Sequence, residues 1–149
     1  GRSVLVNAYS GSRTMKKVLL VDDDKDLVTD LEQVLRSNGY EVATAFRAAD
    51  GLRTALAFRP DVIVLDVMIE NDTAGFEFAY LLRSDRESSR YRPIKDTPIL
   101  LVTAINQVTN FRFSLNEKAS FLPAGVEMVT KPIPIDLLLA KVQQLTAGT

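Results

Sequence analysis

The chain has 149 residues, a hydrophobic content of 46% and a formal net charge of −1, with neither cysteine nor histidine. This length suits one domain with a real core, and the balanced charge gives no indication of a nucleic-acid-binding surface. Disulfides, thiol chemistry and histidine-based catalysis are excluded, no apolar run approaches the roughly 18 residues of a membrane span, and we expect a cytoplasmic protein that does not bind membranes.

The first fourteen residues, GRSVLVNAYSGSRT, are polar and lack the apolar core of a signal peptide. The sequence MKKVLLV that follows looks like a natural beginning. We therefore predict that residues 1–14 are a leader, either added to the natural chain or disordered. The domain itself is expected to cover residues 15–147.

Beyond the leader, short apolar runs alternate with stretches of helical periodicity. Apolar runs bounded by polar residues predict buried strands, and apolar residues at helical spacing predict helices. We expect strands at residues 18–21, 40–45, 62–66, 98–104 and 126–130, and helices at 27–38, 48–58, 76–83 and 134–145. With a further helix between the last two strands, this alternation predicts an α/β protein whose parallel sheet is covered on both faces.

Three consecutive aspartates follow the first predicted strand directly. Two unit charges about 4 Å apart repel by roughly 4 kcal/mol at an effective dielectric constant of 20. Asp24 has an ordinary explanation, because aspartate is a preferred N-cap residue and a helix follows. Asp22 and Asp23 still need one.

Polar residues also end the later strands: Asp66 ends the third, Thr103 the fourth and Lys131 the fifth. In doubly wound sheets, ligands bind beyond the carboxyl ends of the strands where the strand order reverses. If the first and third strands are neighbours, Asp22, Asp23 and Asp66 meet there. Clustered carboxylates suit Mg²⁺, and a hydroxyl with an ammonium suits a phosphoryl group. The pattern therefore favours phosphoryl transfer onto a carboxylate.

The elements LLVDDD, PDVIVLDVM, PILLVTA and VTKPI carry a family resemblance. In them the chain, over about residues 16–145, resembles the receiver domain of two-component response regulators, of the stand-alone CheY type. The resemblance implies a flavodoxin-like (βα)5 fold with five parallel strands in the order 2-1-3-4-5. It also implies an Mg²⁺ site formed by Asp22, Asp23, Asp66 and the backbone carbonyl of Met68.

The same resemblance implies the roles of the remaining residues. Asp66 would be the phosphoacceptor, Thr103 the switch hydroxyl and Lys131 the partner of the phosphoryl group. The peptide bond between Lys131 and Pro132 would be cis, a form essentially restricted to X-Pro bonds.

The chain departs from the family pattern in several places. Glu70 replaces a usual proline and Met128 a common aromatic residue, and the segments 84–97 and 105–123 are long. We expect the first segment to be a solvated loop and the second to hold a short or displaced helix. Met68 and Ile105 flank the site and cannot orient a water molecule, which predicts slow self-dephosphorylation.

The function predicted is phosphorelay signal transduction by a phosphoprotein, not enzymatic catalysis. The chain would accept a phosphoryl group from a sensor histidine kinase or a phosphotransfer protein. Two alternatives stay open: a degenerate receiver that acts only as a protein-interaction module, and an aspartyl-nucleophile phosphatase. The second would normally have an acid two residues after the nucleophile, where Met68 stands.

The chain ends just after its last helix, so we expect a receiver without an attached effector. We expect this receiver to contact a downstream protein and no nucleic acid directly.

The spacing of Leu138, Val142 and Leu145 predicts that they face the sheet. Successive helix positions turn by about 100°, so the other apolar residues cannot all lie on that stripe. We expect an exposed surface that includes Leu137 or Leu139, and a homodimer through this helix.

Overall fold

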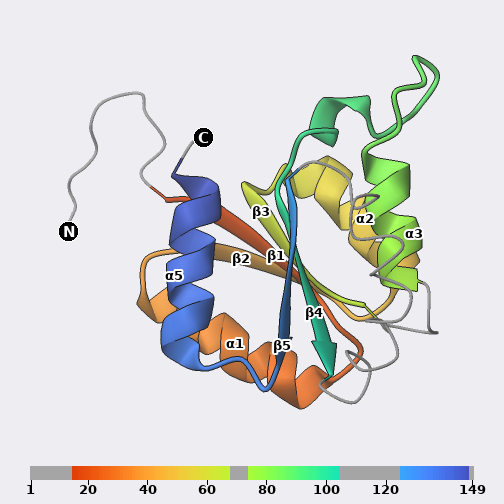
Figure 1. Ribbon diagram of the computed structural model, residues 1–149. Helices are drawn as coiled ribbons and strands as arrows, with labels where there is room; N and C mark the ends of the chain where they lie inside the picture. Colours follow the sequence, from red (N-terminus) through yellow and green to blue (C-terminus); the bar gives the residue numbers. More distant parts are fainter. Residues whose placement is uncertain (1–14, 68–73, 105–124, 148–149) are drawn as a thin grey trace, which may run out of the picture.

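The computed structural model describes residues 15–67, 74–104 and 125–147. In this part of the chain, five parallel strands form one sheet in the order β2-β1-β3-β4-β5 (Figure 1). The strands are β1 (Lys17–Val21), β2 (Glu41–Ala45), β3 (Val62–Asp66), β4 (Ile99–Ala104) and β5 (Val126–Lys131). The predicted doubly wound, flavodoxin-like architecture is confirmed.

The described helices are α1 (Lys25–Ser37), α2 (Ala48–Phe58), α3 (Ala74–Leu82) and α5 (Ile135–Thr146), with a short 3-10 helix, η1 (Arg92–Ile94), before β4. All five predicted strands and the four helices with predicted ranges are therefore present within a few residues of those ranges. The helix that we expected between β4 and β5 falls on residues outside the described part. The same is true of the predicted leader, residues 1–14.

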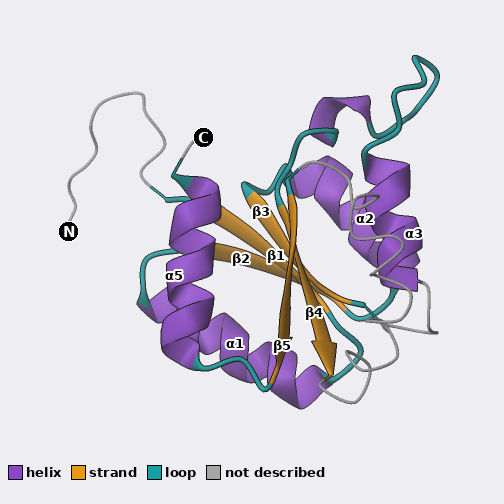
Figure 2. Cartoon of the chain, viewed as in Figure 1, coloured by secondary structure: helices purple, strands orange, loops and turns teal. Residues whose placement is uncertain are grey.

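Helices cover both faces of the sheet, α2 and α3 on one side and α1 and α5 on the other (Figure 2). Successive strand residues point to opposite faces. Leu19 and Ile63 thus pack against α2 and α3, whereas Leu20 and Val64 pack towards α1 and α5. Because both faces are buried, the central strands consist of continuous apolar runs instead of alternating ones.

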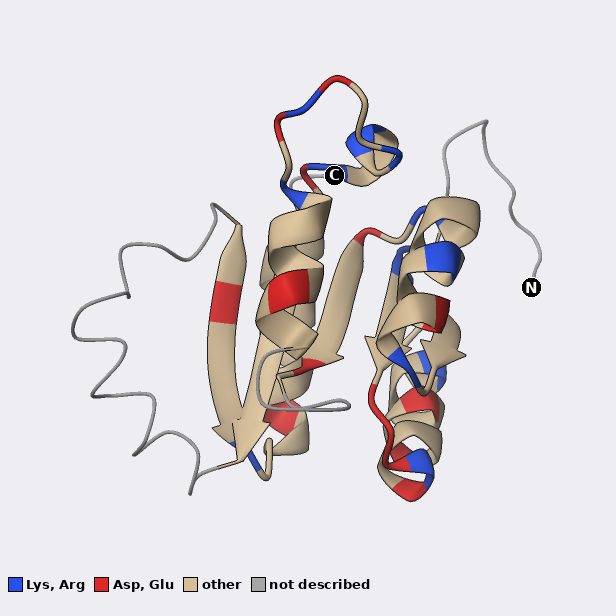
Figure 3. Ribbon diagram, turned by 90° about the vertical axis from the view of Figure 1, so that its right-hand side faces the viewer, with Lys and Arg blue, Asp and Glu red and all other residues tan. Residues whose placement is uncertain are grey.

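The long segment between α3 and β4 was wrongly expected to be only a solvated loop. Its charged residues do protrude at one end of the domain (Figure 3). However, Ile94 in η1 is only 3% exposed, and Tyr91 packs against the core beside it. The guanidinium of Arg83 donates a hydrogen bond to the carbonyl oxygen of Lys95 at 2.7 Å. Apolar burial therefore fixes the second half of this segment on the domain.

The last helix presents the predicted stripe to the sheet. Leu138 and Val142 are fully buried, and Leu145 packs beside them. Leu137 is exposed, whereas Leu139 is partly buried and packs against the core, so Leu137 is the more exposed of the two. None of the described helices has the length and apolar character needed to cross a membrane.

Candidate functional site

Two of the predicted site residues, Asp22 and Asp66, lie at neighbouring strand ends. Asp22 follows β1 directly, and Asp66 is the last residue of β3. The two strands pair in parallel with Val21 opposite Leu65, so both aspartates emerge at the same edge of the sheet. Each side chain is largely buried, with a residue exposure of 8%. The reversal of strand order thus brings together carboxylates that are far apart in the sequence, as predicted.

Asp23 completes a group of three carboxylates at this edge. In the described part of the chain, Asp22, Asp23 and Asp66 can each offer an oxygen such that the three atoms lie within 4.8 Å of one another. Asp23 is the exposed member of the group. Carboxylate oxygens at this spacing fit Mg²⁺, which is held in proteins by one or two carboxylates together with waters and phosphate oxygens.

Asp24 does not belong to the cluster but supports it. Its side chain accepts a hydrogen bond from the backbone N–H of Leu27 at 3.1 Å, so it is the N-cap of α1. Its own backbone N–H donates to Oδ1 of Asp22 at 2.9 Å. The three consecutive aspartates are therefore explained: Asp24 starts the helix and orients Asp22, while Asp22 and Asp23 face the site.

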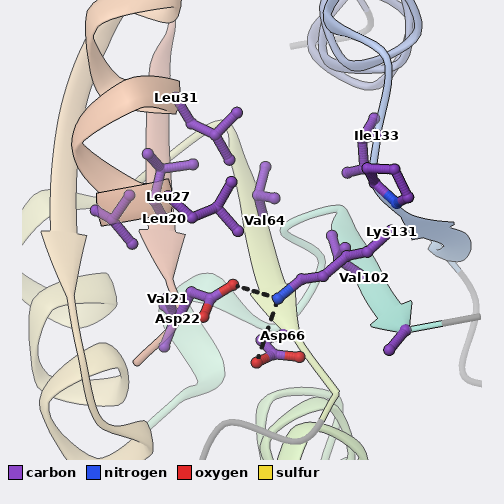
Figure 4. A pocket seen from close by; sticks show the side chains of 13 residues that line it. Leu20, Val21, Asp22, Leu27, Leu31, Val64, Asp66, Val102, Lys131 and Ile133 are labelled. Atoms are coloured by element: carbon purple, nitrogen blue, oxygen red, sulfur yellow. Dashed lines mark hydrogen bonds and ion pairs between the residues drawn. The ribbon is translucent and has the colours of Figure 1, made fainter. Parts of the chain in front are cut away.

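Lys131, the last residue of β5, places its ammonium between the carboxylates of Asp22 and Asp66 (Figure 4). Its Nζ lies 3.0 Å from Oδ2 of Asp22 and 3.7 Å from Oδ2 of Asp66. Burial lowers the pKa of Lys131, but the hydrogen bond to Asp22 and the charges of Asp22, Asp66 and Asp24 outweigh that effect. The pKa is therefore raised above its ordinary value of 10.5. The peptide bond to Pro132 is cis, as predicted.

Thr103 lies at the same edge of the sheet and is fully buried. It precedes the last residue of β4 and pairs with Thr130, the neighbour of Lys131. Its hydroxyl lies 3.5 Å from the carbonyl oxygen of Ala104, at the outer limit of a hydrogen bond. Met68, the expected source of a backbone ligand, and Ile105 are outside the described residues.

A glycine that the sequence analysis did not single out supports the phosphoacceptor strand. The N–H of Gly75, near the start of α3, donates to the carbonyl oxygen of Val67 at 2.9 Å. A Cβ atom at this position would lie 2.6 Å from the Cα of Val67 and 3.0 Å from the carbonyl oxygen of Asp66. Only glycine permits this close approach. The available signal was a glycine directly before the helix predicted at residues 76–83, nine residues after the strand-end Asp66.

An apolar cavity of about 420 Å³ adjoins the carboxylates. It lies between α1, the sheet and the residues after β5, with Asp22, Asp66 and Lys131 at one end (Figure 4). The sequence analysis did not predict it, because the space between α1, the sheet and the residues after β5 depends on how these parts pack in the tertiary structure.

Comparison with known proteins agrees with this fold. The family model "Response regulator receiver domain" matches residues 18–143. The chain belongs to this family of receiver domains. This match confirms the resemblance drawn from the strand-end motifs.

Two curated relatives illustrate the similarity. Transcriptional regulatory protein PrrA of Mycobacterium tuberculosis is 35% identical over 133 residues, which cover 89% of this chain and 50% of PrrA. Response regulator MprA of Mycobacterium ulcerans is 34% identical over 134 residues, which cover 89% of this chain and 51% of MprA. The chain thus spans about half the length of the curated relatives that it matches.

Solved structures resemble the whole domain. Chemotaxis response regulator CheY4 of Vibrio cholerae has a TM-score of 0.68 at 32% identity, covering 89% of this chain and 99% of CheY4. The receiver domain of Francisella response regulator 1452 also has a TM-score of 0.68, at 26% identity, covering 89% of this chain and 98% of that domain. The fold is therefore that of receiver domains in general.

The relatives contradict the set of partners expected from the sequence. We expected a downstream protein, a homodimer through the last helix and no direct contact with nucleic acid, because the chain ends just after its last helix. PrrA is by name a transcriptional regulatory protein, and only half of its length is matched. The expected set of partners was therefore wrong. It had been inferred from the point at which this chain ends, and that point does not show which partners a longer protein has.

Proposed function

We propose that the chain is the phosphoacceptor of a phosphorelay and that Asp66 accepts the phosphoryl group from a histidine kinase or a phosphotransfer protein. The observation that carries this proposal is the grouping of Asp22, Asp23 and Asp66 within 4.8 Å, with the Lys131 ammonium beside two of them. Membership of the receiver family supports the same role. We assign the receiver domain to residues 15–147 and its place of action to the cytoplasm.

In the proposed reaction, a carboxylate oxygen of Asp66 attacks the phosphorus of a phosphohistidine. A P–O bond forms, the P–N bond breaks, and the imidazole leaves with the electron pair of the broken bond. Lys131 pairs with an oxygen of the transferred group, and the hydroxyl of Thr103 donates to another. Asp22, Asp23 and Asp66 would hold Mg²⁺, together with the carbonyl expected from Met68. When bound, this ion offsets the negative charge of the phosphoryl oxygens.

The alternatives are less well supported. A degenerate receiver would lack some of the acids or the lysine, whereas all of them are present and lie together. A phosphatase with an aspartyl nucleophile would normally have an acid at position 68, where the chain has methionine.

The test is phosphorylation by acetyl phosphate with Mg²⁺, followed by intact-mass spectrometry. The parent should gain one phosphoryl group, and Asp66→Asn should gain none. Asp30→Asn, which changes an exposed aspartate of α1, is the matched control and should be labelled like the parent. Undiminished labelling of Asp66→Asn would overturn the assignment.

We further propose that the phosphorylated form is long-lived. Met68 and Ile105 occupy the two positions that we expect to flank the phosphoryl group. Neither side chain can orient a water molecule for hydrolysis. Ile105→Glu should shorten the lifetime of the phosphoprotein, measured by loss of label after the phosphodonor is removed. A lifetime of seconds in the parent would contradict the proposal.

For the longer protein of which such a receiver forms part, we propose a role in transcription. The name of PrrA supports this role, since its matched half corresponds to this chain. Phosphorylation of Asp66 would then be the input that controls the activity of the remainder.

A further inference from the structure

The apolar cavity beside the carboxylates is not used by the phosphoacceptor chemistry. Its walls are apolar side chains from three elements of the sheet, from α1 and from the residues after β5: Leu20, Val64, Val102, Leu27, Leu31 and Ile133 (Figure 4). Such walls offer no oxygen to a metal and no donor to a phosphoryl group. Something other than Mg²⁺ or phosphate is therefore suited to this space.

The size and lining of the cavity fit a small organic molecule. Its volume of about 420 Å³ lies within the range of roughly 300–1,000 Å³ that is usual for small-molecule pockets. The sheet residues at its base are buried, with exposures of 1% for Leu20, 5% for Val64 and 4% for Val102. Water in an apolar space of this kind makes few hydrogen bonds, so an apolar body that displaces it gains free energy.

The charged residues at one end of the cavity determine which sign of ligand charge is favoured. Asp22 and Asp66 reach its lining, Asp23 lies within 4.8 Å of both, and Asp24 is close enough to raise the pKa of Lys131. Among the described residues that line the cavity, Lys131 is the only one with a positive charge. Two carboxylates against one ammonium in the lining, with Asp23 and Asp24 close by, leave this end of the cavity negatively charged, which favours a cation and disfavours an anion.

We propose that this cavity binds a small organic cation with an apolar body. Its ammonium or amidinium end pairs with Asp22 and Asp66, and its aromatic or aliphatic body lies between α1 and the sheet. The site is distinct in chemistry from the Mg²⁺ and phosphoryl site, although the two share carboxylates.

Direct binding tests the proposal without reference to phosphorylation. The probes are phenethylammonium, phenethyl alcohol and phenylacetate, which share an aromatic body and differ in charge. Binding is measured with the parent chain by amide chemical shifts, without Mg²⁺. We expect the cation to saturate the site at a dissociation constant at or below about 1 mM and at least tenfold more tightly than the alcohol. Equal affinity for all three probes, or no binding of the cation, would overturn the proposal.

Matched substitutions locate the bound probe. Leu31→Trp fills the cavity from α1 and should weaken the cation at least tenfold, whereas Leu81→Trp, at a 48% exposed position of α3, should not. Leu27→Phe replaces Leu31→Trp if that variant does not fold. Asp22→Asn should abolish the preference for the cation over the alcohol, whereas the exposed Asp85→Asn should preserve it. If neither Leu31→Trp nor Leu27→Phe weakens the binding of the cation, the probe lies elsewhere, and the proposal is overturned.

Discussion

The ammonium of Lys131 lies 3.0 Å from a carboxylate oxygen of Asp22, a residue 109 positions earlier in the chain. Oδ1 of Asp22 meanwhile accepts from the backbone N–H of Asp24. Both oxygens of Asp22 are thus engaged within the protein. Lys131 compensates the negative charge that the neighbouring strand ends concentrate at this edge.

Removing the lysine should therefore affect stability and metal affinity in opposite directions. Lys131→Met leaves Asp22 and Asp66 without their ammonium, so we expect a loss of about 1–3 kcal/mol in the free energy of unfolding without Mg²⁺. Mg²⁺ should bind roughly tenfold more tightly, because a competing positive charge is gone. Denaturant titration and calorimetry measure the two effects. The control is Lys141→Met, which removes an ion pair with Glu127 and should leave Mg²⁺ affinity unchanged.

The raised pKa of Lys131 predicts a dependence of stability on pH. Because the folded pKa lies above the ordinary value of 10.5, the pair contributes fully below that value. Its contribution is lost as the pH rises through the folded pKa. The difference in unfolding free energy between the parent and Lys131→Met should thus be constant from about pH 7 to about pH 9, and shrink above about pH 10.5. A difference that grows with alkaline pH would contradict the assigned direction.

The N-cap role of Asp24 can be separated from the carboxylate cluster. Asp24→Ala should lower the free energy of unfolding by about 1 kcal/mol, because the N–H of Leu27 loses its acceptor. Asp24→Ser supplies a hydroxyl oxygen in its place and should restore most of the loss. Both variants keep the backbone N–H that orients Asp22, so labelling by acetyl phosphate should persist in both. Loss of labelling in Asp24→Ser would show that the Asp24 carboxylate itself serves the site.

Because α3 approaches the end of β3 closely at Gly75, adding a single methyl group there should lower both stability and the rate of phosphorylation. Gly75→Ala places a Cβ 2.6 Å from the Cα of Val67, so the helix start or the strand end must move. We expect a loss of about 1–3 kcal/mol in stability and slower labelling of Asp66. Gly39→Ala is the control: its φ of +89° is strained for alanine, but nothing lies within 4 Å of the added Cβ. It should cost about 1 kcal/mol and leave the labelling rate unchanged.

The segment before β4 should contribute to stability through one buried side chain. Ile94→Ala should lower the free energy of unfolding by about 2–4 kcal/mol, because Ile94 is 3% exposed within the core. Ile135→Ala removes the same atoms at a position that is 51% exposed and should cost well under 1 kcal/mol. Equal effects in the two variants would mean that the segment is only a solvated connection.

The sequence by itself determined the elements and the chemistry at their ends. Apolar runs such as Val18–Val21 and Val62–Leu65 can be recognised because a strand buried on both faces has no polar position to interrupt it. Helical periodicity located α1 and α5. Because aspartate is a preferred N-cap residue, the role of Asp24 could be distinguished from the roles of Asp22 and Asp23. These are local properties, set by backbone geometry over a few residues.

Only the tertiary structure decided the relationships between distant residues. The side chain of Lys131 reaches Asp22 because β5 and β1 end at the same edge, and Gly75 lies on Val67 because α3 packs directly against β3. The burial of Ile94, the partial burial of Leu139, the exposure of Leu137 and the cavity between α1 and the sheet depend on how several elements pack at once. Periodicity indicates which face of a helix is apolar, but it does not specify how closely that face approaches its neighbours, because that distance results from the packing of all the side chains between them.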